Sequence, residues 1–246
     1  MIRSGSRGSE GASRPVDLPQ AFEKPMRELT RKLWLHYPIV RRVYAAYKRV
    51  VERRRGRVGA GRFERRLAAG PPWKIVIGAF GAFDKGWIPS DIEYLDLLKP
   101  ADWEQHFQPG SIDALLAEHV WEHLSAEEGI AAAKTCFKYL KPGGYLRVAV
   151  PDGLFPDPDY IKWVRLGGLG PEADTHWVLY TYRSFRNVFE SAGFRVVLCE
   201  YWDEKGEFHT TEWDPADGMI RRSRRFDGRN RHNQLKFTSL MLDARK

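Results

Sequence analysis

Residues 111–152, SIDALLAEHVWEHLSAEEGIAAAKTCFKYLKPGGYLRVAVPD, decide the fold. The stretch begins with a short apolar run, IDALLA, which is typical of a strand buried on both faces. Ser125 and Glu128 then form a capping box, which predicts a helix from Ser125 to about Leu140. The turn sequence KPGG ends that helix, and YLRVAVP predicts another strand. The stretch therefore predicts a strand–helix–strand unit of an α/β protein.

The segments on either side continue this alternation. Further strands are predicted in WKIVIGAF, GWIPSDIEY, EYLDLLK, FRVVLCEYW and KFTSLMLDARK, and an amphipathic helix is predicted over 181–193, closed by Gly193. Strands that alternate with helices indicate a doubly wound, mostly parallel, Rossmann-like sheet. The last two strands are separated by a long polar segment and are expected to form an antiparallel hairpin at the edge of this sheet.

The connection EHVWEHL has two interpretations. His119, Glu122 and His123 match H-x-x-E-H, a motif in which two histidines bind zinc and the glutamate acts as a base. That motif needs one continuous helix, whereas here a strand precedes it and the capping box begins a helix after it. We therefore place Glu118 and His119 at the carboxyl end of a strand, where open α/β sheets bind ligands. Hydrogen bonding within a buried loop is the interpretation we prefer for Glu122 and His123, and zinc stays an alternative because a single turn would still bring the histidines together.

Glycines and carboxylates follow the other predicted strands. Gly78 and Gly81 follow the first strand, but neither G-x-G-x-x-G nor the P-loop pattern is present. Asp91 and Asp96 stand at the ends of the next two predicted strands. A carboxylate after the second strand is well placed to accept both hydroxyls of a ribose. This order of residues indicates a nucleoside site.

The segments IVIGAFG, GWIPSDIEYLDL, SIDALLAEHVWEHL and KYLKPGGYLRVAVPD together resemble the class I S-adenosylmethionine-dependent methyltransferases. The resemblance is to a short bacterial group with E-H-V-x-E-H-L followed by L-K-P-G-G-x-L-R-x-A-V-P-D. It covers roughly residues 73–200, and the closing strand near 235–245 fits the same fold. It implies a sheet of order 3-2-1-4-5-7-6 and S-adenosyl-L-methionine as the cofactor.

Roles for individual residues follow from this resemblance. It implies that residues under or beside the cofactor are Gly78, Ala79, Gly81, Asp91 at the ribose, Asp96 and Leu97 near the adenine, and Glu118. His119 would face both cofactor and acceptor, and it is the candidate base if the acceptor is a hydroxyl. Asp152 is a second catalytic candidate, with an ordinary turn before Gly153 as the equal alternative.

The basic charge of the chain belongs to its N-terminal part. Residues 1–70 hold 18 Lys and Arg against 6 Asp and Glu, and the remainder holds 22 against 26. We predict a disordered tail (1–20), a basic amphipathic helical extension (21–60, ending in the Gly-rich break GRVGAGR at 56–62) and a methyltransferase-like domain (61–246). The extension either packs on the domain, or makes a peripheral membrane contact through residues 21–55, or binds nucleic acid, which is the least favoured alternative.

The remaining features concern the compartment and the acceptor. The buried settings of Cys136 and Cys199 and the lack of a long apolar run indicate a cytoplasmic protein, peripheral to a membrane if the extension binds one. Aromatic and polar residues of 155–177 and 203–232 suit a small-molecule or glycan acceptor, methylated on oxygen rather than nitrogen. His209, Glu212 and Asp214 lack convincing metal-ligand spacing. An inactive binding module and a zinc hydrolase using His119, Glu122 and His123 are the alternative functions.

Overall fold

The computed structural model describes residues 58–79, 84–170, 172–230 and 234–246. The chain divides into two units, Met1–Glu52 and Arg53–Lys246, and every described residue belongs to the second. The predictions for the N-terminal tail and for the basic helices up to residue 57 therefore lie outside the described residues.

Seven strands form one sheet in the order β2-β1-β3-β4-β7-β5-β6. Their bounds are β1 Lys74–Ile77, β2 Ile88–Pro89, β3 Ile112–Glu118, β4 Leu140–Pro151, β5 Arg195–Trp202, β6 Phe208–Thr210 and β7 Ser239–Arg245. Strands β1, β2, β3 and β4 pair in parallel, while β7 is antiparallel to both β4 and β5, and β6 is antiparallel to β5. Five strands therefore run in one direction, and the predicted mostly parallel, Rossmann-like sheet is confirmed.

Two details of the predicted sheet are wrong. Residues 93–99, expected to form a strand, are turns in which the buried Leu95 and Leu97 point into the core. Among the described residues, the sheet accordingly ends at the two-residue strand β2, and no strand takes the first place of the implied order. The last two predicted strands, β5 and β7, do pair antiparallel, but β7 lies inside the sheet and β6 takes the edge.

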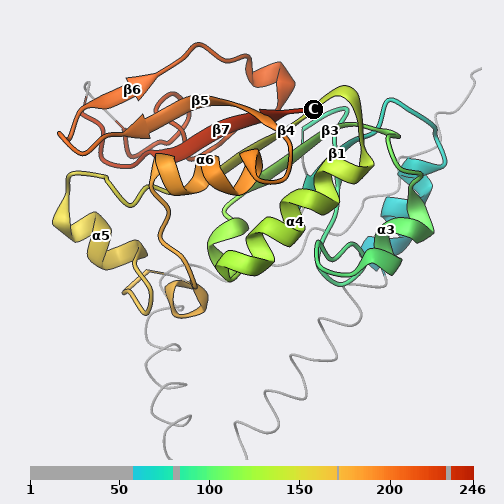
Figure 1. The fold of residues 1–246 in the computed structure, drawn as a ribbon, viewed down its shortest axis with the longest axis horizontal. Helices are drawn as coiled ribbons and strands as arrows, with labels where there is room; N and C mark the ends of the chain where they lie inside the picture. The colour runs from blue at the N-terminus through green and yellow to red at the C-terminus, as the bar shows by residue number, and fades with distance from the viewer. Residues whose placement is uncertain (1–57, 80–83, 171, 231–233) are drawn as a thin grey trace, which may run out of the picture. The chain divides into compact units, whose positions relative to one another are not determined.

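The helices α3 (Pro100–His106), α4 (Ala126–Tyr139) and α6 (Tyr182–Glu190) pack on one face of the sheet, and α4 and α6 lie side by side in front of it (Figure 1). The capping box of α4 is confirmed, because Ser125 and Glu128 each bind the other's backbone N–H. Trp103 of α3 stacks on Tyr139 of α4 with ring centroids 5.3 Å apart. One hydrophobic core therefore extends along this face beneath α3, α4 and α6.

The opposite face is covered by an irregular segment between β6 and β7. Trp213 and Ile220 of this segment pack with Val76, Leu116 and Met241 of the sheet. Buried polar groups fasten the segment, since Glu200 accepts hydrogen bonds from the Trp213 indole N–H at 3.0 Å and the Arg224 backbone N–H at 2.7 Å. This part of the predicted acceptor segment 203–232 is thus an ordered cover.

Residues 58–67 are helical, so the Gly-rich break predicted at 56–62 is wrong for its described part. Phe63 of this helix is buried and contacts Tyr94 and Phe107 at ring-centroid distances of 5.5 and 6.2 Å. Burial of one aromatic ring outweighs the helix-weakening effect of the glycines, which is about 1 kcal/mol for each. Among the described helices, none has the length and apolar character that a membrane crossing requires.

Candidate functional site

The carboxyl ends of β1, β2 and β3 meet at one edge of the sheet. The register pairs Val76 with Pro89 and Ile77 with Ala117, so the next residues along each strand stand side by side. The pairing of β1 and β2 extends past their ends, because the Ala79 N–H donates to the Ser90 carbonyl at 2.8 Å. Gly78, Asp91 and Glu118 consequently share this edge. The chain leaves β1 toward β2 on one side and resumes in β3 on the other, which makes this edge a topological switch point.

Gly78 is the position at this edge where only glycine fits. Its φ angle is +64°, and a Cβ placed on it would lie 2.8 Å from Cγ2 of Val120. The backbone of Gly78 therefore packs directly against the Val120 side chain, in the connection that follows β3. Ala79 is buried, while Gly81 lies outside the described residues.

Asp91 is half-buried at the end of β2 and accepts the Ile92 backbone N–H at 2.8 Å. Burial raises the pKa of its carboxyl to about 6, with the Glu93 charge adding a smaller rise and the Ile92 N–H opposing it. A carboxyl held out of water in this way gains from a ligand that donates hydrogen bonds to its charged form.

Asp96 and Leu97 have local structural contacts. One oxygen of Asp96 accepts the Leu98 backbone N–H at 2.9 Å and the other is 2.9 Å from the Lys99 ammonium. Leu97 is buried in the main core. Their predicted place near an adenine stays a prediction, and these contacts explain both residues without one.

Glu118, the last residue of β3, binds the cover of the sheet. Its two carboxylate oxygens accept the backbone N–H groups of Arg222 at 2.7 Å and Arg221 at 3.2 Å. Glu118 thus helps to order the segment that covers the sheet. An effect of Glu118 on cofactor binding would be indirect, through that segment.

His119 has the most unusual backbone of the site. Its φ angle is +59°, a left-handed conformation that costs a residue with a side chain about 1–2 kcal/mol. Its backbone N–H donates to the Ala149 carbonyl at 2.8 Å, which extends the pairing of β3 with β4 by one residue. The positive φ angle then turns the chain away from the sheet. The ring then lies with Nε2 2.9 Å from the Ser239 hydroxyl and Nδ1 3.2 Å from Oε1 of Glu122.

Glu122 lies in the short helix η1 (Trp121–His123), between β3 and α4. The predicted strand-to-helix connection is thus confirmed, and H-x-x-E-H is not in one continuous helix. The Glu122 side chain is 1% exposed, and neither of its oxygens receives a hydrogen bond. The expectation that Glu122 satisfies hydrogen bonds in a buried loop is therefore wrong for its carboxylate. His123 does bind within the loop, through Nδ1 to the Thr175 hydroxyl at 2.9 Å.

Asp152 is fully buried after β4, and backbone amides bind both of its oxygens. Leu154 donates to Oδ1 at 2.9 Å, which is the predicted turn, and Trp202 of β5 donates to Oδ2 at 2.8 Å. Burial raises the pKa of the Asp152 carboxyl to about 6 although both hydrogen bonds lower it. These contacts favour the turn-forming alternative over a catalytic role.

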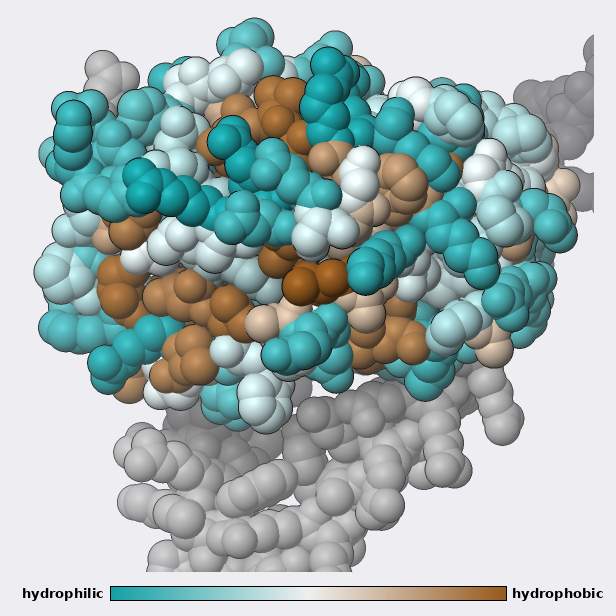
Figure 2. Space-filling view, in the orientation of Figure 1, coloured by the Kyte–Doolittle hydropathy of each residue, from teal (hydrophilic) through white to brown (hydrophobic). Residues whose placement is uncertain are grey.

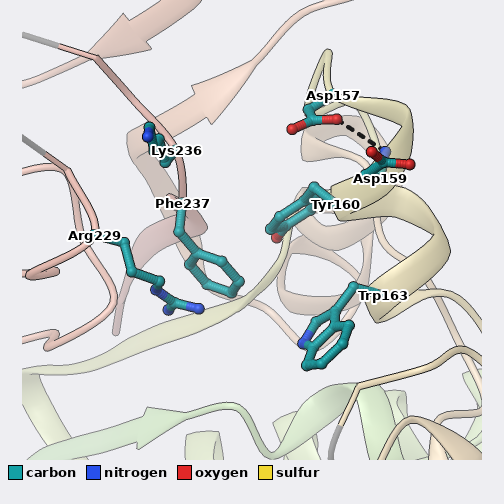
Figure 3. Close-up of a pocket in the computed structure, with 7 residues that line it drawn as sticks. All are labelled: Asp157, Asp159, Tyr160, Trp163, Arg229, Lys236 and Phe237. Carbon is teal, nitrogen blue, oxygen red and sulfur yellow. Dashed lines mark hydrogen bonds between the residues drawn. The ribbon is translucent and has the colours of Figure 1, made fainter.

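A pocket of about 210 Å³ opens between α5 (Pro158–Val164) and the segment before β7. Figure 3 shows Tyr160 and Trp163 projecting from α5 toward Phe237, whose ring carries the Arg229 guanidinium at 3.4 Å from its centroid. Asp157, Asp159 and Lys236 complete the lining. Phe237 also stacks on the His119 ring, with centroids 6.5 Å apart, and so connects the pocket to the strand edge.

The region beside the pocket also exposes hydrophobic side chains. Between residues 163 and 177 these are Trp163, Leu166, Leu169 and Trp177. On the face drawn in Figure 2, hydrophobic patches are interrupted by hydrophilic residues. The exposed aromatics fit the predicted acceptor segment 155–177.

Several residues of the site were not identified from the sequence. Ser239 and Phe237 are far from His119 in the chain, and only the antiparallel insertion of β7 beside β4 brings them to it.

His209, Glu212 and Asp214 have separate partners, since His209 binds Asp203 at 2.8 Å while Glu212 pairs with Arg225. Cys136 and Cys199 are free and buried, as predicted.

The strand edge and the pocket beside α5 are linked by the contact between His119 and Phe237. Residues 61–198 match the family described as Methyltransferase domain. The chain belongs to this family, which confirms the predicted methyltransferase class and agrees with S-adenosylmethionine as the cofactor.

The chain is also similar to solved structures with low sequence identity. One is a SAM-dependent methyltransferase from Archaeoglobus fulgidus, with 15% identity, 78% of this chain and 94% of that chain covered, and a TM-score of 0.42. Another is a possible histamine N-methyltransferase from Thermotoga maritima, with 14% identity, 83% and 99% of the two chains covered, and a TM-score of 0.40. No curated protein matches the chain.

Proposed function

We propose that this chain transfers the methyl group of S-adenosylmethionine to a hydroxyl of a small-molecule or glycan-type acceptor bound in the pocket beside α5. The observation that carries the proposal is the position of His119. It leaves β3 at the edge shared by Gly78 and Asp91, and its ring stacks on Phe237 of the pocket. His119 thus stands between the strand edge and the pocket.

The residues at the strand edge fit the cofactor. Gly78 lies at the switch point, where strand ends offer backbone groups to a nucleoside. Asp91 is at the end of the adjacent strand, and its ionised carboxyl can accept the two hydroxyls of a ribose. When bound, S-adenosylmethionine supplies an electrophilic methyl group on a sulfonium sulfur, which leaves with the electron pair of the broken bond.

His119 would accept the proton that the acceptor hydroxyl loses as its oxygen bonds to the methyl carbon. Nδ1 faces the Glu122 carboxylate, so the proton of the neutral ring belongs on Nδ1 and the lone pair on Nε2. Nε2 is bound by the Ser239 hydroxyl, which is buried, whereas the His119 side chain remains 14% exposed. Since the Ser239 hydroxyl occupies Nε2 in this structure, the acceptor would pass its proton to Nε2 through that hydroxyl, or bind Nε2 after a rotation of the Ser239 side chain.

The pocket supports a polar acceptor with flat apolar faces. Trp163 offers an exposed ring for stacking, and Arg229, Lys236, Asp157 and Asp159 offer both donors and acceptors of hydrogen bonds. Sugars and other polyhydroxylated molecules present this combination of apolar ring faces and hydroxyl edges. The strand edge, His119 and the pocket would together hold the cofactor and the acceptor for this reaction.

Titration calorimetry of S-adenosylhomocysteine into the full chain tests the cofactor half. We expect Asp91→Asn to weaken binding at least tenfold and Glu127→Gln, an exposed carboxyl in the first turn of α4, to leave it unchanged. A folded protein that does not bind the compound would support the inactive binding module. Equal affinities for the two variants would remove Asp91 from the site.

The acceptor half is tested with S-adenosylmethionine labelled in its methyl group and a panel of glycans, phenols and amines. The proposal predicts label in an ether and loss of at least 100-fold in kcat for His119→Ala, with S-adenosylhomocysteine affinity retained. Transfer to amines alone, or full activity of the folded His119→Ala protein, would contradict it.

A further inference from the structure

We infer that Glu122, His123 and His176 form a binding site for one divalent transition-metal ion of the zinc class. One ligand atom from each side chain lies within 4.8 Å of the others. His119, the first histidine of H-x-x-E-H, is not in this group, and a histidine from a distant loop takes its place. The inference concerns metal binding alone and does not depend on the proposed methyl transfer.

The buried carboxyl group of Glu122 is the first argument. Its side chain is 1% exposed, and neither carboxylate oxygen receives a hydrogen bond, although Oε1 lies 3.2 Å from Nδ1 of His119. Leaving a buried carboxylate without donors costs several kcal/mol, and native proteins normally satisfy such a group. A bound dication would satisfy it: Oε1 already faces His119, which leaves Oε2 for the ion.

The hydrogen bonds of the two histidines are the second argument. His176 Nδ1 lies 2.8 Å from the Val164 carbonyl, which can only accept, so Nδ1 carries the proton. Thr175 donates its hydroxyl proton to the Glu172 carbonyl at 2.7 Å, so toward His123 Nδ1 it acts as an acceptor and that nitrogen is protonated as well. Both rings therefore present Nε2 with a lone pair, which is the tautomer that metal sites select through such outer hydrogen bonds.

The backbone holds the two parts of the site together. The Glu122 carbonyl accepts the N–H of Trp177, the residue after His176, at 2.8 Å. The rings of His123 and His176 are edge to face, with centroids 4.8 Å apart. Ligand atoms on a tetrahedral ion with bonds of about 2.0–2.1 Å lie about 3.4 Å apart, so side-chain shifts of about 1 Å would close the site. Three protein ligands would leave one position for water or an acceptor oxygen.

Asp203, Glu207 and His209 also lie within 4.8 Å of one another, and they provide the matched control. In that group the Asp203 carboxylate already accepts His209 Nε2 at 2.8 Å and two backbone N–H groups, and Glu207 is exposed. No buried charge there requires an ion.

The test uses the full chain without an affinity tag, freed of metal with a chelator, and titrated with Co(II) and then Zn(II). We expect one equivalent of Co(II) to bind with visible absorption bands, which Zn(II) displaces. His123→Ala and His176→Ala should each weaken binding at least 100-fold. Thr175→Val removes no ligand atom but deletes the hydroxyl that binds both His123 Nδ1 and the Glu172 carbonyl, and should weaken binding about tenfold or more. His209→Ala should bind as the original protein does.

Circular dichroism establishes that each variant is folded, and Glu122→Gln replaces any variant that is not, since it keeps the side-chain shape while removing the charge. Failure of the original protein to bind Co(II) or Zn(II) would overturn the inference. So would binding that survives both His176→Ala and Glu122→Gln, or binding that is lost in His209→Ala.

Discussion

Gly78 and Val120 lie at the ends of neighbouring strands, so close that a Cβ on Gly78 would approach Cγ2 of Val120 to 2.8 Å. Gly78 also has a φ angle of +64°. Two separate costs therefore oppose any side chain there: a steric clash across the strands and a left-handed backbone. The first depends on Val120, whereas the second does not, and this difference makes the two costs separable.

We expect Gly78→Ala to lower the free energy of unfolding by about 2–4 kcal/mol, of which about 1–2 kcal/mol is backbone strain. In a Val120→Ala background the clash is absent, and the same substitution should cost only the strain. Urea denaturation of the four proteins of this double-mutant cycle measures both terms. If Gly78→Ala costs the same in both backgrounds, the close approach of the two residues does not limit position 78.

Arg147 fastens the irregular cover to the sheet. It is 1% exposed, binds both oxygens of Asp243 at 2.7 and 3.0 Å, and donates to the carbonyls of Asp214 and Gly218. We expect Arg147→Met to cost about 3–5 kcal/mol of unfolding free energy, because Asp243 is then buried without its partner.

Arg245 is the control, since it also contacts Asp243, at 3.4 Å, but is 42% exposed. Arg245→Met should cost less than about 1 kcal/mol. Thermal or urea unfolding distinguishes the two variants. A loss for Arg147→Met no larger than for Arg245→Met would show that the buried pair adds nothing to the stability of the cover.

The strand edge was predictable because local signals and the rules of parallel sheets act together there. The apolar run before Glu118 and the capping box at Ser125 each determine a boundary from a few neighbouring residues. Parallel pairing then places Gly78, Asp91 and Glu118 at one edge without further information. Residues 93–99 misled the prediction because their alternating apolar side chains face the core from turns.

Contacts that depend on long-range pairing were not predictable. His176 reaches Glu122 through an irregular loop, and no periodic pattern marks that loop. No sequence pattern pointed to Thr175. Its proposed role depends on its hydroxyl donating to the Glu172 carbonyl and accepting from His123, which the sequence does not show. The motif H-x-x-E-H marks the segment of the proposed metal site, but among the described residues it is Glu122 and His123, without His119, that group with His176.

Asp152 predicts a pH dependence of stability. Burial raises the pKa of its carboxyl in the folded protein to about 6 from 3.8, so the folded state binds the proton more tightly than the unfolded state does. Stability from this group is therefore greatest below the unfolded pKa and falls as the pH rises from about 4 to about 6. Between pH 4.5 and 6.5 the loss amounts to about 2 kcal/mol.

Asp152→Asn keeps the side-chain shape but removes the titration, so its stability should fall less than that of the original protein over the same range. Urea denaturation at the two pH values measures the difference, and titrations elsewhere cancel between the proteins. Parallel changes in the two proteins would show that Asp152 is ionised throughout this range in the folded state.

Trp163 tests the acceptor pocket. Its ring projects from α5 toward Phe237 while remaining 46% exposed, so it can be removed without leaving a cavity in the core (Figure 3). If the acceptor stacks on this ring, Trp163→Ala should raise KM for the acceptor about tenfold, which corresponds to about 1.4 kcal/mol, and leave kcat nearly unchanged. Leu169→Ala, which changes a 76% exposed side chain outside the pocket lining, should alter neither constant. A fall in kcat without a change in KM would mean that Trp163 affects the reacting groups and does not hold the acceptor.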